Sequence, residues 1–337
     1  MRERFINQID INSGHIDSNM AEFASFLRSD SQKLFLKSLY EKINDDRSDL
    51  TPLHFGLLVF GAYRYSLATN LGISRLSELD NWEEAVELTD KNAFYRTVEL
   101  IVLNKSVNIT SPYRYGALTY AITELYGDTN IDVLDIGGGF YPLGVGSLSP
   151  EYLPSAQDDY TGRIKSKLDN NSLLFRRVTT VDIQEPDPLW TAACVWTPIK
   201  EIPELTKNLH EKLIASDSKI DFVLGDICVD SWIPSREYDV CWMANVSYQL
   251  NPEKYAQAMG NINRSLKLGG WLLVADYEKG GSKRRPFTYE LTGRNKTAEG
   301  VLSEPKRLFL LDSGDCKQIA TAQRESYLLA EMQAISS

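Results

Sequence analysis

The second half of the chain alternates short apolar runs with segments of helical pattern, and this alternation limits the fold more than any other feature. The apolar runs have about the length of strands and are rich in Val, Ile or aromatic residues; they cover residues 131–136, 178–183, 220–226, 238–244 and 271–277. Helical patterns at 203–216 and 251–270 stand between some of these runs. The alternation predicts an α/β fold with a mostly parallel sheet and helices on both faces. Two further runs, 286–292 and 306–312, predict an antiparallel strand pair at the sheet edge.

The first third of the chain shows helical spacing of apolar residues with no strand pattern between. This spacing predicts helices over residues 29–45, 52–72 and 92–105. A further helix is expected from Ser111, a suitable N-cap followed by Pro112, to Gly127. The length of 337 residues allows one or two domains. We therefore expect a helical N-terminal lid or substrate region, 1–110, and a second domain, 111–337.

Charge and rare residues exclude several classes of function. A net charge of −10 disfavours nucleic acid and anionic membranes as partners, because both require a positive surface. The cysteines form no CxxC pair and the three histidines lie far apart, so no metal site is predicted: Cys194, Cys228, Cys241, Cys316, His15, His54 and His210. No apolar stretch approaches the ~18 residues of a membrane span, and the N-terminus lacks a signal-peptide core. We expect a cytoplasmic protein with a small-molecule substrate; whether it forms a homodimer is left open.

The sequence VLDIGGGFYPLG, residues 133–144, places three glycines directly after the first predicted strand. In a doubly wound sheet, ligands bind at the carboxyl ends of the strands. Gly137 and Gly139 match the start of a dinucleotide-binding turn, but Pro142 occupies the third glycine position and has no amide hydrogen. Carboxylates at other strand ends accept hydrogen bonds from hydroxyls and amines, as a ribose or an amino-acid ammonium group would offer.

Five motifs in this order resemble those of class I S-adenosylmethionine-dependent methyltransferases: VLDIGGG, TVDIQ, LGDI, YDVCWMANVSYQL and LKLGGWLLVADY. The resemblance covers about residues 128–313 and implies a Rossmann-like sheet with an antiparallel C-terminal strand pair. The helical N-terminal region is also similar to an uncharacterised bacterial subfamily of predicted methyltransferases. Two departures stand out. Tyr141 occupies a position where the family has glycine, and the long connection after the first strand implies an insertion at about 145–177.

The resemblance implies S-adenosyl-L-methionine as cofactor and assigns residues to it. The glycine turn would approach the methionine part and the ribose, Asp182 would accept the two ribose hydroxyls, Asp226 would face the adenine amino group, and Asn245 would lie near the methionyl head or the substrate. The full set of cofactor residues implied is Asp135, Gly137, Gly138, Gly139, Asp182, Ile183, Asp226, Ile227 and Asn245. A bidentate carboxylate suits a cis-diol and rejects ligands that lack it.

Methyl transfer from a sulfonium is a direct displacement, so catalysis consists mainly of aligning the acceptor atom and excluding water. A general base is needed only when the acceptor keeps its proton, and the candidates are Tyr248, Glu278 and Asp276. The candidates for substrate binding are Tyr113, Arg114, Tyr141 and Ser247. We expect transfer to an O, N or C atom of a small molecule in small-molecule biosynthesis, with no metal. Two alternatives stay open: a non-catalytic or regulatory protein with this fold, and an NAD-dependent oxidoreductase, which Pro142 disfavours.

Overall fold

In the computed structural model, the chain forms two compact units. The first unit comprises Met1–Ile109 and Asp187–Lys212, and the second comprises Thr110–Pro186 and Leu213–Ser337. The residues that the structure describes are 18–47, 52–108, 118, 121–122, 125–126, 130–145, 175–195, 197–217, 219–229, 232, 236–277 and 288–312. The segment Asp187–Lys212 belongs to the helical unit, whereas its sequence position lies between two strands of the second unit.

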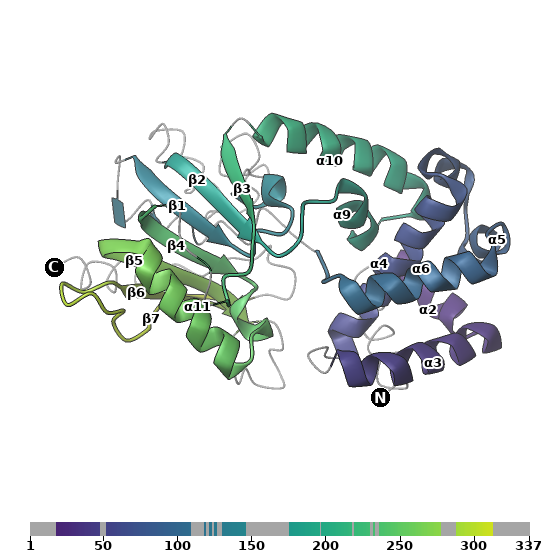
Figure 1. Ribbon diagram of the computed structural model, residues 1–337. Helices are drawn as coiled ribbons and strands as arrows, with labels where there is room; N and C mark the ends of the chain where they lie inside the picture. Colours follow the sequence, from purple (N-terminus) through teal and green to yellow (C-terminus); the bar gives the residue numbers. More distant parts are fainter. Residues whose placement is uncertain are drawn as a thin grey trace. The chain divides into compact units, whose positions relative to one another are not determined.

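The first unit is built from helices (Figure 1). They are α2 (Ser18–Leu27), α3 (Asp30–Asp46), α4 (Pro52–Leu71), α5 (Trp82–Glu87), α6 (Lys91–Asn104), α9 (Pro188–Cys194) and the part of α10 (Ile202–Ser216) up to Lys212, with the short 3₁₀ helices η1 (Ile73–Glu78) and η5 (Ile199–Glu201). The helices predicted at 29–45, 52–72 and 92–105 are confirmed as α3, α4 and α6. An aromatic core centres on Phe23, whose ring lies 5.1 Å from Phe60 and 4.6 Å from Trp82 between ring centroids. Within the described residues, no helix has the length and apolar character needed to cross a bilayer.

Helix α9 packs against α4 at a glycine. A Cβ atom added to Gly61 would lie 3.0 Å from the Trp190 ring and 3.1 Å from Cys194 Sγ, so any larger residue would force the ring or the sulfur to shift. The Asp187 carboxylate caps α9 by accepting from the Trp190 amide at 2.9 Å, and it pairs with Lys105 Nζ at 3.0 Å. These contacts make α9 part of the helical core.

Arg64 on α4 holds the connection that leads from α9 to α10. Its guanidinium is fully buried and donates to both the carbonyl and the hydroxyl oxygen of Thr197, at 2.5 and 3.0 Å. The guanidinium carbon also lies 4.9 Å from the centre of the Phe60 ring, in a cation–π contact. Burial lowers the pKa of Arg64 to about 9. The α9–α10 connection is therefore tied to α4 by a buried charge.

The second unit contains one seven-stranded sheet with the order β3-β2-β1-β4-β5-β6-β7 (Figure 1). The strands are β1 (Ile131–Ile136), β2 (Phe175–Asp182), β3 (Ile220–Leu224), β4 (Tyr238–Ala244), β5 (Leu266–Tyr277), β6 (Thr288–Asn295) and β7 (Lys306–Asp312). Strands β1 to β5 pair in parallel, β6 is antiparallel to β5, and β7 is antiparallel to β6. This confirms the predicted mostly parallel sheet with an antiparallel C-terminal pair.

One predicted boundary is wrong. The helical pattern predicted over 251–270 ends earlier, because α11 runs only from Pro252 to Ser265 and β5 begins at Leu266. Leu266 is fully buried and pairs with Tyr238 of β4, so it belongs to the sheet. Gly269 and Gly270, the last two residues of the predicted range, lie inside β5, and a Cβ at Gly270 would lie only 2.9 Å from the Asp239 carbonyl oxygen.

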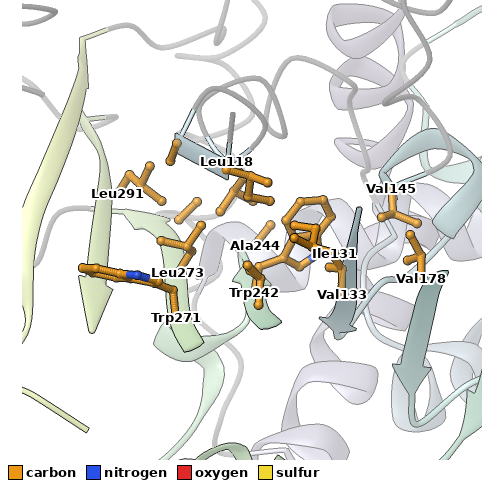
Figure 2. Close-up of a cluster of buried hydrophobic side chains, with 14 of the residues drawn as sticks. Leu118, Ile131, Val133, Val145, Val178, Trp242, Ala244, Trp271, Leu273 and Leu291 are labelled. Carbon is orange, nitrogen blue, oxygen red and sulfur yellow. The ribbon is translucent and has the colours of Figure 1, made fainter. Parts of the chain in front are cut away.

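The two faces of the sheet bury separate hydrophobic clusters, because successive side chains of a strand point to opposite faces. On one face, Val133, Trp242 and Leu273 from three neighbouring strands lie in one cluster (Figure 2). The other face buries Leu134, Met243 and Leu272 in a cluster that includes Ile262 of α11. Both clusters pack against the central strands and thereby fix the positions of the carboxyl ends of β1 and β4.

Candidate functional site

The site is defined by the point where the strand order of the sheet reverses. Strand β1 has β2 on one side and β4 on the other, although β2 and β3 both stand between β1 and β4 in the chain. Ligands of doubly wound sheets bind at such a point, beyond the carboxyl ends of the strands. The turn that follows β1 and the loop that follows β4 therefore form the candidate site.

The turn after β1 depends on glycine at two positions. Gly137 and Gly139 have φ values of 67° and 55°, in the left-handed region that other residues rarely adopt. A Cβ atom at Gly137 would also lie 2.4 Å from Val246 Cγ2 in the loop after β4. The Gly137 amide donates to the Val181 carbonyl at 2.8 Å, which ties the turn to β2. The turn is thereby compact and fixed between β2 and β4.

Asp182, the last residue of β2, is held against this turn. Its Oδ2 accepts a hydrogen bond from the Gly139 amide at 2.8 Å, and its Oδ1 accepts one from the Gln184 amide at 3.0 Å. Partial burial raises the pKa of Asp182, while the backbone amides act in the opposite direction. A carboxylate has about four lone-pair sites, so these two bonds leave room for further donors.

The ends of β2 and β3 are joined next to Asp182. The Gly225 amide donates to the Asp182 carbonyl at 2.8 Å, and Asp226 Oδ1 accepts from the Cys228 amide at 2.8 Å. The two predicted cofactor isoleucines lie in different environments: Ile183 is 59% exposed, whereas Ile227 is buried in the α11-side cluster. Of the pair, the structure leaves Ile183 accessible to a ligand.

Asn245, directly after β4, has an unusual backbone conformation. It is the one non-glycine residue with positive φ, at 61°, in the part of the chain that the structure describes. Its amide donates to the Ala275 carbonyl at 2.9 Å, and its carbonyl accepts from Gln249 Nε2 at 2.6 Å, which hold this conformation. Its side-chain Oδ1 is buried and has no hydrogen-bond partner among the described residues. Such an acceptor is costly to bury unpaired, so a donor on a ligand would stabilise it.

The predicted catalytic and substrate residues are only partly described. Asp276 on β5 is buried and accepts a hydrogen bond from the Ser247 hydroxyl, so the structure brings these two residues together. Tyr248 belongs to the 3₁₀ helix η6 (Ser247–Gln249), but its side chain is outside the described residues. Four further predictions also lie outside them: Tyr113, Arg114, Glu278 and most of the insertion at 145–177.

Asp135, predicted as a cofactor residue, lies inside the sheet unit with no exposed surface. Strand register places it in a row with Thr180 of β2 and Trp242 of β4. Thr180 Oγ1 donates to Asp135 Oδ2 at 3.2 Å, and Trp242 Nε1 donates to Oδ1. Burial raises the pKa of Asp135 to about 7, although both donors act to lower it. Trp242 is a site residue that the sequence patterns did not indicate.

Tyr141, at the position where the resembling family has glycine, is also buried. Its ring stacks on Phe222 with 5.8 Å between centroids, and its hydroxyl donates to Asp217 Oδ1 at 2.5 Å. Burial and this carboxylate raise the pKa of Tyr141. The bulky side chain thus has a place in the core.

Comparisons with known proteins give weak similarity. No protein-family model matches the chain, and none of the curated proteins does. Among solved structures, the chain is similar to the N-methyltransferase NodS from Bradyrhizobium japonicum WM9 in complex with S-adenosyl-L-homocysteine, with 15% identity and a TM-score of 0.27 over 49% of this chain and 62% of that one. It is also similar to a SAM-dependent methyltransferase from Thiobacillus denitrificans in complex with the same compound, with 16% identity and a TM-score of 0.29 over 54% and 55% of the two chains.

A third structure, the [4+2]-cyclase SpnF, matches with 15% identity and a TM-score of 0.29 over 69% of this chain and 60% of that one. The chain spans less than two thirds of the length of each of these three structures. These three proteins have different activities, and their identities to this chain and TM-scores are low. Nothing about the activity of this chain follows from them, so the function is inferred from the site itself.

Proposed function

We propose that the protein is an S-adenosyl-L-methionine-dependent methyltransferase that acts on a small-molecule acceptor by in-line displacement. The observation that carries this proposal is the position of Asp182. Its carboxylate is anchored by the amide of Gly139 at the end of the glycine turn, at the point where the strand order reverses. A carboxylate at this point suits a ribose cis-diol.

The other groups at the strand ends fit the remaining parts of this cofactor. The buried Oδ1 of Asn245 has no partner among the described residues, and an ammonium group of a methionyl head supplies the donors that it needs. Asp226 follows β3, which pairs with β2, and its carboxylate suits an exocyclic adenine amine. Gly137 has no room for a side chain because a Cβ there would meet Val246, so the glycine keeps the turn close to the loop after β4.

When bound, the cofactor supplies an electrophilic methyl group on a sulfonium. The chain's residues then have to align the acceptor and exclude water. We assign acceptor binding to Ser247, held by Asp276, together with Tyr113 and Arg114. Asp276 is our first candidate for a base, because it is buried beside Ser247 at the end of β5, and Tyr248 and Glu278 are the alternatives.

The acceptor class and the absence of a metal are part of the proposal. A net charge of −10 is unfavourable for a nucleic-acid substrate, which supports a small acceptor. The three histidines and four cysteines are widely spaced in the sequence, which favours a reaction without a metal ion.

Calorimetric titration of the full chain with S-adenosyl-L-homocysteine and, separately, NADH tests the proposal. We expect micromolar or tighter binding of S-adenosyl-L-homocysteine and none of NADH. Binding of NADH alone would support the oxidoreductase, and binding of neither would support a non-catalytic protein that keeps this fold. Mass spectrometry of the compound that co-purifies with the chain provides an independent check of the same assignment.

A further inference from the structure

We infer that Asp135 supports the cofactor turn from inside the sheet without touching the cofactor, and that Trp242 is the positioning residue that holds Asp135 in place. This inference rests on the proposed function, because it concerns the same cofactor site. It changes the role of Asp135 from the direct ligand that the motif resemblance implies to a buried support.

Burial excludes a direct role for Asp135 in the described structure. The residue has no exposed surface, and each carboxylate oxygen accepts a hydrogen bond from a neighbouring strand, one from Thr180 on β2 and one from Trp242 on β4. Trp242 is itself fully buried in the cluster of Figure 2, beside Ile131 and Val133 of β1. Its N–H therefore has a fixed direction.

The glycine turn packs directly on this carboxylate. A Cβ atom at Gly138 would lie 2.7 Å from Asp135 Oδ2 and 2.2 Å from Thr180 Cγ2. The next residue, Gly139, donates its amide to Asp182, the proposed ribose ligand. Any movement of the Asp135 carboxylate is thus transmitted through Gly138 to Gly139 and to the orientation of Asp182.

The charge state of Asp135 matters for this contact. An indole N–H only donates hydrogen bonds and an ionised carboxylate only accepts them, so the ionised form suits this partner best. The groups that face Asp135 are the donors Thr180 on β2 and Trp242 on β4, and the negative charge of Asp182 acts against ionisation. A negative charge beneath the turn also attracts the ammonium group that S-adenosyl-L-methionine and S-adenosyl-L-homocysteine share. Loss of the indole N–H therefore favours protonation and weakens cofactor binding.

The variant Trp242→Phe tests this role, because it removes the N–H and keeps most of the aromatic volume. We expect calorimetry to show about 10-fold weaker binding of S-adenosyl-L-homocysteine at neutral pH. The pH below which binding weakens should rise by about one unit, because ionised Asp135 has lost a donor. A loss of packing alone would weaken binding equally at every pH.

The matched control is Trp190→Phe in the helical unit. Trp190 is also buried, and its Nε1 donates to the Ser106 carbonyl at 2.9 Å. This control should leave both the affinity and its pH profile unchanged. Thr180→Val is a second test variant, which removes the other donor, keeps the side-chain volume, and is expected to shift the pH profile in the same direction. If Trp242→Phe does not fold, Thr180→Val serves as the test variant in its place.

Hydrogen exchange in the ligand-free protein gives a readout that needs no cofactor. A peptide covering residues 135–143 should exchange faster in Trp242→Phe than in wild type, and at the wild-type rate in Trp190→Phe. The inference would be overturned if Trp242→Phe bound S-adenosyl-L-homocysteine as tightly as wild type does, with the same pH profile, and if its peptide exchanged at the wild-type rate. Failure of wild type to bind S-adenosyl-L-homocysteine would instead refute the proposed function, and equal exchange rates would then also refute the support by Trp242.

Discussion

Trp242 on β4 donates its indole hydrogen to Asp135 on β1, and the two residues are direct neighbours in the parallel register. With Thr180 on β2, they form a polar row across three central strands within an otherwise apolar face of the sheet. A buried carboxylate in such a position reduces stability unless its hydrogen bonds are complete. Its position directly beneath the glycine turn is consistent with a role in the site.

Asp135→Asn should change the pH dependence of stability. The folded-state pKa of Asp135, about 7, lies above its ordinary value of 3.8. Its contribution to stability is therefore fully present below the unfolded pKa and is lost as pH rises through about 7. Since Asn does not titrate, the variant should gain stability relative to wild type as pH rises from about 5 to about 7, by up to ~1.4 kcal/mol per pH unit, and the difference should level off above that. Urea unfolding at several pH values measures this difference.

Asp132→Asn is the control for this experiment. A hydrogen bond from Arg176 lowers the pKa of Asp132, so its contribution to stability is present above the unfolded pKa and is lost only as pH falls through the lower folded value. The difference between this variant and wild type should stay constant over the same neutral range. A parallel response of the two variants would contradict the raised pKa of Asp135.

Gly138→Ala should destabilise the sheet unit by about 1–3 kcal/mol. The added methyl group would meet both the Thr180 side chain and the Asp135 carboxylate, which are fully buried or nearly so and have little freedom to move. Denaturant unfolding of the two proteins gives the difference.

Gly260→Ala provides the matched control for the glycine substitution. Gly260 lies inside α11, and no atom lies within 4 Å of a Cβ added there. Because alanine restricts the unfolded chain and favours a helix, this variant should be more stable by about 0.5–1 kcal/mol. Equal effects of the two substitutions would show that Gly138 does not pack as the structure describes.

Asp182→Asn should weaken binding of S-adenosyl-L-homocysteine by about 100-fold, because two hydrogen bonds from the ribose to a charged acceptor are impaired. The Gly139 amide would also lose its charged partner. Asp221→Asn, at an exposed carboxylate near the start of β3, is the control and should bind as wild type does. Calorimetry measures the affinities of the three proteins for S-adenosyl-L-homocysteine. An affinity of Asp182→Asn within a few-fold of that of wild type would show that Asp182 is not part of the site.

Tyr141→Phe should lower the free energy of unfolding by about 1 kcal/mol, because it removes the hydrogen bond to Asp217 while keeping the ring against Phe222. Thermal unfolding measures this loss. Binding of S-adenosyl-L-homocysteine should stay unchanged, since the ring lies in the core. A large loss of affinity at unchanged stability would instead restore the predicted contact of Tyr141 with ligand.

The strands and the position of the turn were predictable from the sequence, because strand patterns are local and parallel strands bring their carboxyl ends to one edge. The proximity of Gly139 and Asp182 follows from this rule. The bond between Trp242 and Asp135 does not, since it depends on the register of two strands far apart in the chain. Periodicity assigns both residues to one face and gives no information about which buried polar groups meet.

Two local features had sequence signals of different strength. Asn tolerates the left-handed conformation better than most residues, so Asn245 after a strand was a recognisable candidate for the positive φ that it adopts. Helix α9 has only 7 residues, which is too short for a clear periodic pattern. Its place in the helical unit depends on the gap that Gly61 leaves for Trp190, and such a gap is a tertiary property.

The packing of α9 against α4 has a consequence for synthesis on the ribosome. Residues 1–109 emerge first, but the helical unit also needs residues 187–212, which follow β1 and β2 in the chain. Until translation has passed that segment, which takes seconds at the usual rate, Gly61 and Arg64 lack the partners that cover them. The N-terminal helices therefore complete their folding only after β1 and β2, two of the seven strands, have been made, and a nascent chain halted before residue 187 presents an unfinished helical unit to chaperones and proteases.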